Sequence, residues 1–226
     1  MNTRFNRIIF DYDGTLIIHN KEKQAREIAR YLKIPEDKFE DFIKRIDVLF
    51  STSYGSHLYE KKKITYPLYC KCIEGIMGPL KEYGITVDDL NRAIDKNVRN
   101  NSQVTPYAKE VLEYLKNKGY ELCIFTNGFH YYQVGNMKHN GLYEFFDRIY
   151  AWDNNYAKPD MRAFERVLAG TKPEKNIMIG DNVIADILPA KEIGMYTIGI
   201  NMQNNEKYLS TPDKYITDLR ELKGIL

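Results

Sequence analysis

Short apolar runs alternate with amphipathic stretches through the second half of the chain. The runs predicted to be strands are residues 7–10, 120–125, 148–152, 176–179, 195–200 and a short stretch near 215. The stretches predicted to be helices are residues 107–118, 129–139, 160–168, 189–193 and the end of the chain, up to residue 226. Helices that join consecutive strands imply a parallel sheet with right-handed crossovers, so we expect an α/β fold with a Rossmann-like core.

The stretch between the first two predicted strands has a different pattern. Apolar residues recur at helical spacing over residues 23–32, 36–50 and 66–83, and Thr86 precedes a fourth helical pattern at residues 87–98. This pattern contains no recognisable strand. We therefore predict a helical cap domain at residues 16–103, inserted into a catalytic core made of residues 1–15 and 104–226.

Composition narrows the class of protein. The 226 residues are 43% hydrophobic and 28% charged, which is typical of a globular protein with an adequate core. The net charge is only +2, so electrostatics gives no reason to expect binding to a nucleic acid polymer. No apolar segment is long enough for secretion or for a membrane span, so we expect a cytoplasmic protein. Cys70, Cys72 and Cys123 form neither an even disulfide set nor a C-x-x-C pattern, and Cys123 lies in an apolar run as a small buried residue.

Two carboxylates follow the first predicted strand. Asp11 and Asp13 end the run Ile8-Ile9-Phe10, and Gly14 and Thr15 come next. Placing two carboxylates together at the end of a buried strand is costly unless a bound divalent cation offsets their charge. The segment therefore favours a metal site with a nucleophile or an acid/base pair over an ordinary acidic turn.

Polar side chains also follow two later strands. Thr126 and Asn127 end the second strand, while Asp181 and Asp186 follow the strand at residues 176–179. Ligands of open parallel sheets bind beyond the carboxyl ends of the strands, which brings these groups toward Asp11. Lys158, just before a helix, could reach the same crevice. Taken singly, three of these residues have a simpler explanation. Thr126 could lie in an ordinary turn, Lys158 could be a solvated loop lysine, and Asp186 could cap a helix.

These four segments, in this order, resemble the haloacid dehalogenase-like hydrolase superfamily, specifically its phosphatases with a helical cap. The segments that carry the resemblance are Asp11-Tyr12-Asp13-Gly14-Thr15, Thr126-Asn127-Gly128, Lys158-Pro159-Asp160, and Gly180-Asp181 through Asp186. One departure is Ala185, where many members have Asn. Because the spaced acids are kept, this departure bears on the fine positioning of the last acid rather than on metal binding.

The resemblance implies a role for each matched residue. Asp11 would be the nucleophile that forms an aspartyl-phosphate, and Asp13 would protonate the leaving oxygen and then activate water. Mg²⁺ would be held by Asp11, by the backbone carbonyl of Asp13 and by Asp181. Asp186 would support the metal site without binding the ion directly. Thr126 and the Asn127 backbone N–H would bind the phosphoryl oxygens, and Lys158 would neutralise charge between Asp11 and the phosphate.

The retained Asp13 favours phosphate-ester hydrolysis, because dehalogenases of the superfamily lack this second acid. A sugar phosphomutase of the same superfamily shares the acids and is an alternative. A non-catalytic phosphate-accepting or ligand-binding protein is another, although every expected acid and Lys158 are present.

The expected partner is a small phosphorylated metabolite, either a nucleotide or a sugar phosphate, bound by a monomer or a small homo-oligomer. The aromatic and basic residues of the cap that could contact it are Tyr54, His57, Tyr59, Lys61, Lys62, Lys63, Tyr66 and Tyr69. A half-buried cap helix with a solvated lysine run is the better explanation for most of these residues.

Overall fold

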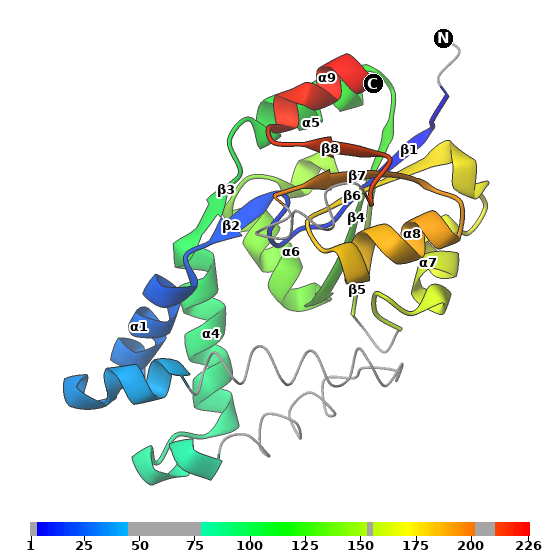
Figure 1. Ribbon diagram of the computed structural model, residues 1–226. Coiled ribbons are helices and arrows are strands. Elements are labelled where there is room, and N and C mark those ends of the chain that lie inside the picture. The colour runs from blue at the N-terminus through cyan, green and yellow to red at the C-terminus, as the bar shows by residue number, and fades with distance from the viewer. Residues whose placement is uncertain (1–3, 45–77, 153–155, 202–210) are drawn as a thin grey trace.

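The computed structural model describes residues 4–44, 78–152, 156–201 and 211–226. Its centre is a six-stranded sheet in the order β5-β4-β1-β6-β7-β8, in which every neighbouring pair is parallel (Figure 1). The strands are β1 (Arg7–Phe10), β4 (Glu121–Phe129), β5 (Arg148–Trp152), β6 (Asn176–Gly180), β7 (Tyr196–Ile200) and β8 (Lys214–Ile216). The predicted parallel α/β core is confirmed.

The middle strand β1 is buried on both faces, which explains its unbroken apolar sequence. Successive side chains of a strand point to opposite faces of the sheet. Ile8 and Phe10 accordingly pack in one hydrophobic cluster, and Ile9 packs in another with Phe125 and Met178. The second cluster also contains Cys123, which is fully buried as predicted.

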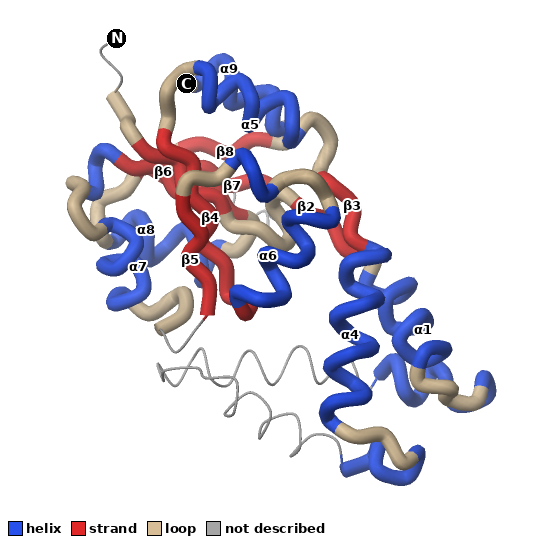
Figure 2. Tube along the Cα trace, turned by 180° about the vertical axis from the view of Figure 1, so that it is seen from behind, coloured by secondary structure: helices blue, strands red, loops and turns tan. Residues whose placement is uncertain are grey.

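Helices cover both faces of the sheet. The helices that pack on the first cluster are α5 (Ala108–Asn117), α6 (His130–His139) and α9 (Leu222–Ile225). The helices that pack on the second are α7 (Met161–Leu168) and α8 (Leu188–Glu192). The sheet is therefore the middle layer of a three-layer arrangement (Figure 2).

A third cluster lies among helices that project away from the sheet (Figures 1 and 2). Helices α1 (Lys21–Tyr31) and α4 (Val87–Asn101) pack side by side. The short turn η1 (Glu36–Lys38) follows α1 in the sequence, and η2 (Gly78–Tyr83) precedes α4. Ile28, Phe42 and Leu90 are buried there against Trp152 from the end of β5. Thr86 caps α4 in a reciprocal capping box with Asp89, as its position before the apolar pattern predicted.

Two features of the sequence prediction are wrong. The stretch predicted to be entirely helical contains two short strands, β2 (Ile17–His19) and β3 (Ser102–Val104), which pair antiparallel. Three residues are too few for an alternating pattern to be recognised. The strand predicted to stop at Phe125 continues to Phe129 with a shift of register, so Thr126 and Asn127 lie within β4.

Several predictions lie outside the described residues: the helical patterns between residues 45 and 77, the cysteines Cys70 and Cys72, and all the aromatic and basic cap residues that begin with Tyr54 and end with Tyr69. The division into core and cap at residues 16–103 stays a prediction. Among the described residues, no helix has the length and apolar character needed to cross a bilayer.

Candidate functional site

The carboxyl ends of β1 and β6 and the last residues of β4 meet at a pocket of 280 Å³. Its lining includes every residue to which the sequence analysis gave a catalytic, phosphate-binding or metal-site role, because parallel strands bring their carboxyl ends to the same edge. The lining residues are Asp11, Asp13, Thr126, Asn127, Gly128, Gln133, Lys158, Asp181, Asn182, Ala185 and Asp186. The sequence prediction thus placed its candidates in one site.

Asp11 and Lys158 form the buried centre of this pocket. The Lys158 ammonium donates to Asp11 Oδ1 at 2.7 Å and to Asp186 Oδ1 at 2.5 Å, and its side chain is 2% exposed. Thr15 donates to the other Asp11 oxygen at 3.4 Å. Burial raises the pKa of Asp11 well above its ordinary value, and the charges of Asp186 and Asp181 act in the same direction, against Lys158. Lys158 is therefore not the solvated loop lysine of the simpler reading.

Three carboxylates converge beside Lys158. One oxygen each from Asp11, Asp181 and Asp186 lie within 4.8 Å of one another. Burial, with the nearby charge of Asp186, raises the pKa of Asp181 to about 7. Three acids crowded around one ammonium leave negative charge uncompensated, and carboxylate oxygens are the ligands that hard divalent cations prefer. The donor set fits such a cation.

Two of the three convergent acids, Asp11 and Asp181, are predicted metal ligands. The third is Asp186, which was predicted to support the metal site without binding the ion directly. The predicted ligand atom of Asp13 is its backbone carbonyl, so the position of its side chain does not bear on that prediction.

Asp186 also accepts from the Asn182 backbone N–H at 3.0 Å. It does not cap the helix that contains Pro189, α8, whose N-cap residue is Ile187 and has no side-chain cap hydrogen bond. Asp186 itself lies in the preceding turn, Val183–Ile187, where the Asn182 side chain accepts from the backbone N–H groups of Ile184 and Ala185.

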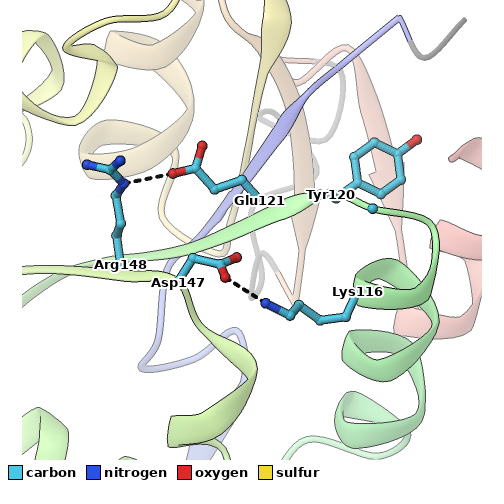
Figure 3. A pocket seen from close by; sticks show the side chains of 6 residues that line it. Lys116, Tyr120, Glu121, Asp147 and Arg148 are labelled. Carbon is cyan, nitrogen blue, oxygen red and sulfur yellow. Dashed lines mark hydrogen bonds and ion pairs between the residues drawn. The ribbon is translucent and has the colours of Figure 1, made fainter.

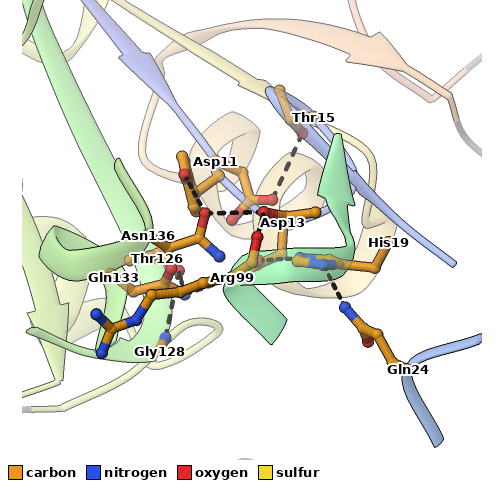
Figure 4. Close-up of polar contacts among 12 residues, drawn as sticks. Asp11, Asp13, Thr15, His19, Gln24, Arg99, Thr126, Gly128, Gln133 and Asn136 are labelled. Atoms are coloured by element: carbon orange, nitrogen blue, oxygen red, sulfur yellow. Dashed lines mark hydrogen bonds and ion pairs between the residues drawn. The ribbon is translucent and has the colours of Figure 1, made fainter. Parts of the chain in front are cut away.

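Asp13 is held by hydrogen bonds at both of its oxygens (Figure 4). His19 Nε2 lies 2.6 Å from Asp13 Oδ1, and Gln133 Nε2 donates to Asp13 Oδ2 at 2.6 Å. Burial acts to raise the pKa of the Asp13 carboxyl, but the hydrogen bonds from His19 and Gln133 outweigh it and keep that pKa below its ordinary value. Sequence reasoning did not identify either partner as part of the site.

The Thr126 hydroxyl is positioned to donate into the pocket. Its oxygen accepts from the Gly128 backbone N–H at 3.2 Å and from Gln133 Nε2 at 3.1 Å. A hydroxyl has two acceptor lone pairs and one proton. Since both lone pairs are engaged, the proton is left to donate to a bound oxygen.

The Asn127 side chain fixes the loop that carries Lys158. Its Nδ2 donates to the Lys158 backbone carbonyl, and its Oδ1 accepts from the Lys158 backbone N–H, both at 2.9 Å. This reciprocal pair ties β4 to the loop before α7. Asn127 was predicted to act through its backbone N–H, and the side-chain contact adds a second, structural contribution.

Gly14 permits the close approach of Asp181. It has φ +88°, and a Cβ built there would lie 2.4 Å from Asp181 Oδ2. Gly14→Ala should therefore lower the free energy of unfolding by about 1–3 kcal/mol from backbone strain, and should also weaken metal binding by displacing Asp181. Gly119→Ala is the matched control, because Gly119 has φ +85° with nothing within 4 Å of its Cβ position.

Chemical denaturation and a metal titration of both variants check this prediction. We expect Gly14→Ala to lose at least as much stability as Gly119→Ala. We expect weaker metal binding in Gly14→Ala only. Unchanged metal affinity in Gly14→Ala would contradict it.

A second pocket, of 670 Å³, lies at the start of β4, away from the strand ends that form the site. Its charged groups pair with one another: Lys116 with Asp147 at 2.7 Å, and Arg148 with Glu121 at 2.8 Å (Figure 3). Mutually compensated surface charges of this kind give no preference for a charged ligand. The chemistry therefore belongs to the first pocket.

Comparison with protein families agrees with this geometry. A family model for the haloacid dehalogenase-like hydrolases matches residues 5–194. The chain belongs to this family. The match includes the Asp11, Thr126, Lys158 and Asp181 segments together with the helices between them.

Individual relatives are phosphatases by name. The chain is 34% identical to the glyceraldehyde 3-phosphate phosphatase of Methanothermobacter thermautotrophicus over 54% of its own length, and spans 58% of that protein. It is 31% identical to the pyrophosphatase PpaX of Bacillus velezensis, over 87% of the chain and 83% of PpaX. The fold is similar to that of the HAD-hydrolase YfnB of Bacillus subtilis, solved bound to magnesium, with a TM-score of 0.74 and 24% identity over 99% of both chains.

Proposed function

We propose that this protein is a magnesium-dependent phosphatase that hydrolyses small phosphate monoesters through an aspartyl-phosphate on Asp11. The observation that carries the proposal is the contact of Asp11 with the buried Lys158 ammonium, at 2.7 Å, inside a pocket where two further carboxylates converge. A nucleophilic carboxylate that must approach a phosphate dianion needs positive charge around it. The family match and the phosphatase relatives support the same reaction class.

The chain's own residues divide the reaction between them. Asp11 attacks phosphorus and carries the phosphoryl group, and the leaving oxygen receives a proton from Asp13. Asp13 then removes a proton from the water that attacks phosphorus. The bond between phosphorus and the Asp11 oxygen breaks, and inorganic phosphate leaves the free enzyme. Thr126 donates its hydroxyl proton to a phosphoryl oxygen, and Lys158 offsets the charge that Asp11 and the phosphate bring together.

Asp11, Asp181 and Asp186 are the side chains that would hold the cation, with the backbone carbonyl of Asp13 as the further predicted ligand. The bound cation would neutralise the phosphate and align it with Asp11. A hard ion fits the all-oxygen donor set, and Mg²⁺ is the ion we propose.

We propose a small phosphorylated metabolite as the substrate, covered by the inserted segment at residues 16–103. The pocket holds 280 Å³, and β2, which belongs to that segment, places His19 against Asp13 of the pocket lining. The relatives named above differ in substrate, one acting on a sugar phosphate and another on pyrophosphate. A panel of nucleotides and sugar phosphates would define the preference, and equal rates on all of them would exclude a nucleotide-specific enzyme.

Removal of the cation tests the proposal directly. After treatment with EDTA, hydrolysis of p-nitrophenyl phosphate should fall by about 100-fold or more, and Mg²⁺ should restore it. Because the pKa of Asp181 is about 7, Mg²⁺ must displace a proton below that pH. The Mg²⁺ concentration for half-maximal rate should then rise as the pH falls from 8 to 6, by up to about tenfold per unit.

Asp181→Asn is the control for this pH dependence. The variant should need more Mg²⁺ at every pH, and its requirement should change less between pH 8 and pH 6 than that of the wild type. Full activity in EDTA would contradict the proposed cation dependence. No phosphate release from any monoester in the panel would contradict the phosphatase proposal as a whole.

A further inference from the structure

The side chain of Asp13 is held by a residue that comes from outside the sheet. Asp13 lies three residues beyond the end of β1 and lines the pocket, and its side chain is 42% exposed, so packing alone does not fix its rotamer. His19, on β2, approaches it with Nε2 at 2.6 Å from Oδ1 and is itself only 16% exposed. The other ring nitrogen, Nδ1, lies 2.9 Å from Gln24 Nε2 on α1. Figure 4 shows this Gln24–His19–Asp13 chain.

Local backbone structure brings His19 back to Asp13. Gly14 donates its backbone N–H to the Ile17 carbonyl at 2.8 Å, and Ile17 donates to the Tyr12 carbonyl at 3.1 Å. These bonds fold β2 tightly against the end of β1. His19 also pairs with Ser102 in the β2–β3 ladder, which fixes its backbone. The contact with Asp13 is therefore made by two segments with little freedom to move apart.

We propose that His19 is a positioning residue for the reaction: it holds the Asp13 carboxyl where that group exchanges a proton with the leaving oxygen, and Gln24 fixes the orientation of the His19 ring. This inference rests on the proposed function and adds to it a residue that the sequence motifs do not contain. His19 does not itself touch the phosphate.

Imidazole suits this position for a chemical reason. Asp13 has to be protonated when the leaving group departs and ionised when water attacks. A ring nitrogen can donate to an ionised carboxylate or accept from a protonated carboxyl, whereas the Gln133 Nε2 group on the other oxygen can only donate. His19 can therefore keep its contact through both steps, with the Gln24 amide able to donate to or accept from Nδ1.

The loss of rate on replacing His19 should depend on the leaving group of the substrate. This dependence distinguishes a positioning role for His19 from a purely structural one. Phenyl phosphate and p-nitrophenyl phosphate have nearly the same shape but differ in their leaving groups. Phenol has a pKa near 10, like the tyrosine side chain, so phenolate needs protonation as it leaves far more than p-nitrophenolate does. We use kcat/KM because it reports the steps up to formation of the phosphorylated enzyme. His19→Ala should lower kcat/KM about 30- to 100-fold for phenyl phosphate and less than about 5-fold for p-nitrophenyl phosphate.

Four further variants complete the experiment, all as the full chain with Mg²⁺. His19→Gln carries an amide N–H near the Nε2 position and should recover part of the loss on phenyl phosphate. His19→Ala combined with Asp13→Asn should be no worse on phenyl phosphate than Asp13→Asn alone, because both act through one group. His139→Ala, at the exposed end of α6, should match the wild type on both substrates.

Each outcome decides the matter. A larger loss on phenyl phosphate with rescue by His19→Gln supports the inference. Equal losses on both substrates, or no loss, would overturn it while leaving the phosphatase proposal intact. If the wild-type protein hydrolyses neither ester, the proposed function fails and this inference fails with it, which is a different result from a failure confined to the His19 variants.

Discussion

Asp11→Asn should abolish phosphate release, lowering kcat by at least about 10⁴-fold, because an amide cannot form the aspartyl-phosphate. The fold should persist. Asp11 is one of three crowded carboxylates, and burial, together with the charges of Asp186 and Asp181, raises its pKa, so a neutral amide removes a desolvation cost and repulsion there. Lys158 should keep its partner Asp186, which lies 2.5 Å away in the wild type. The melting temperature should therefore stay within a few degrees of the wild-type value.

Trapping the intermediate makes this test specific to the mechanism. Wild-type enzyme quenched in acid during turnover of a radiolabelled phosphate ester should retain label on the protein, and hydroxylamine should release it. Asp11→Asn should retain none. Asp88→Asn, an exposed acid in the first turn of α4, is the matched control and should behave as wild type. Turnover that survives Asp11→Asn would remove the covalent mechanism.

The strand positions were predictable because buried parallel strands leave a simple signal. An unbroken run such as Ile8-Ile9-Phe10 is needed when both faces of a strand are covered, and the hydrophobic clusters on either side of β1 confirm that requirement. The parallel order then brings Asp11 and Asp181 to one edge, so the location of the pocket followed from the pattern. Lys158 could be added because its segment matched a motif.

Other parts of the site leave no such signal. His19 lies on a three-residue strand that pairs with β3. This pairing connects positions more than eighty residues apart, so no local sequence pattern predicts it. Gln133 contacts Asp13 only because α6 follows β4 at the correct angle. The place of the Asp186 carboxylate among the three convergent acids depends on a π-helical turn at Val183–Ile187, which apolar spacing does not predict. These contacts are set by tertiary packing.

Lys158→Met should cause the largest loss of stability of the proposed substitutions, and it should also lower activity. It removes the ammonium that lies between Asp11 and Asp186 but keeps the length of the side chain in its buried site. Loss of this charge should lower kcat/KM for p-nitrophenyl phosphate by about 10²- to 10³-fold. Breaking a buried ion pair by removing one partner costs about 3–5 kcal/mol, which we expect in the free energy of unfolding measured in EDTA at pH 8.

The pH dependence of that loss identifies its cause. Burial already raises the pKa of Asp11, and without Lys158 it should rise further above the unfolded value. The folded variant then binds a proton that the unfolded chain releases, so its deficit relative to wild type should grow with pH, by up to about 1.4 kcal/mol per unit. Lys172→Met, at an exposed position, should show no such dependence. A deficit equal at pH 5 and pH 8 would mean that packing, and not the charge beside Asp11, is what Lys158 contributes.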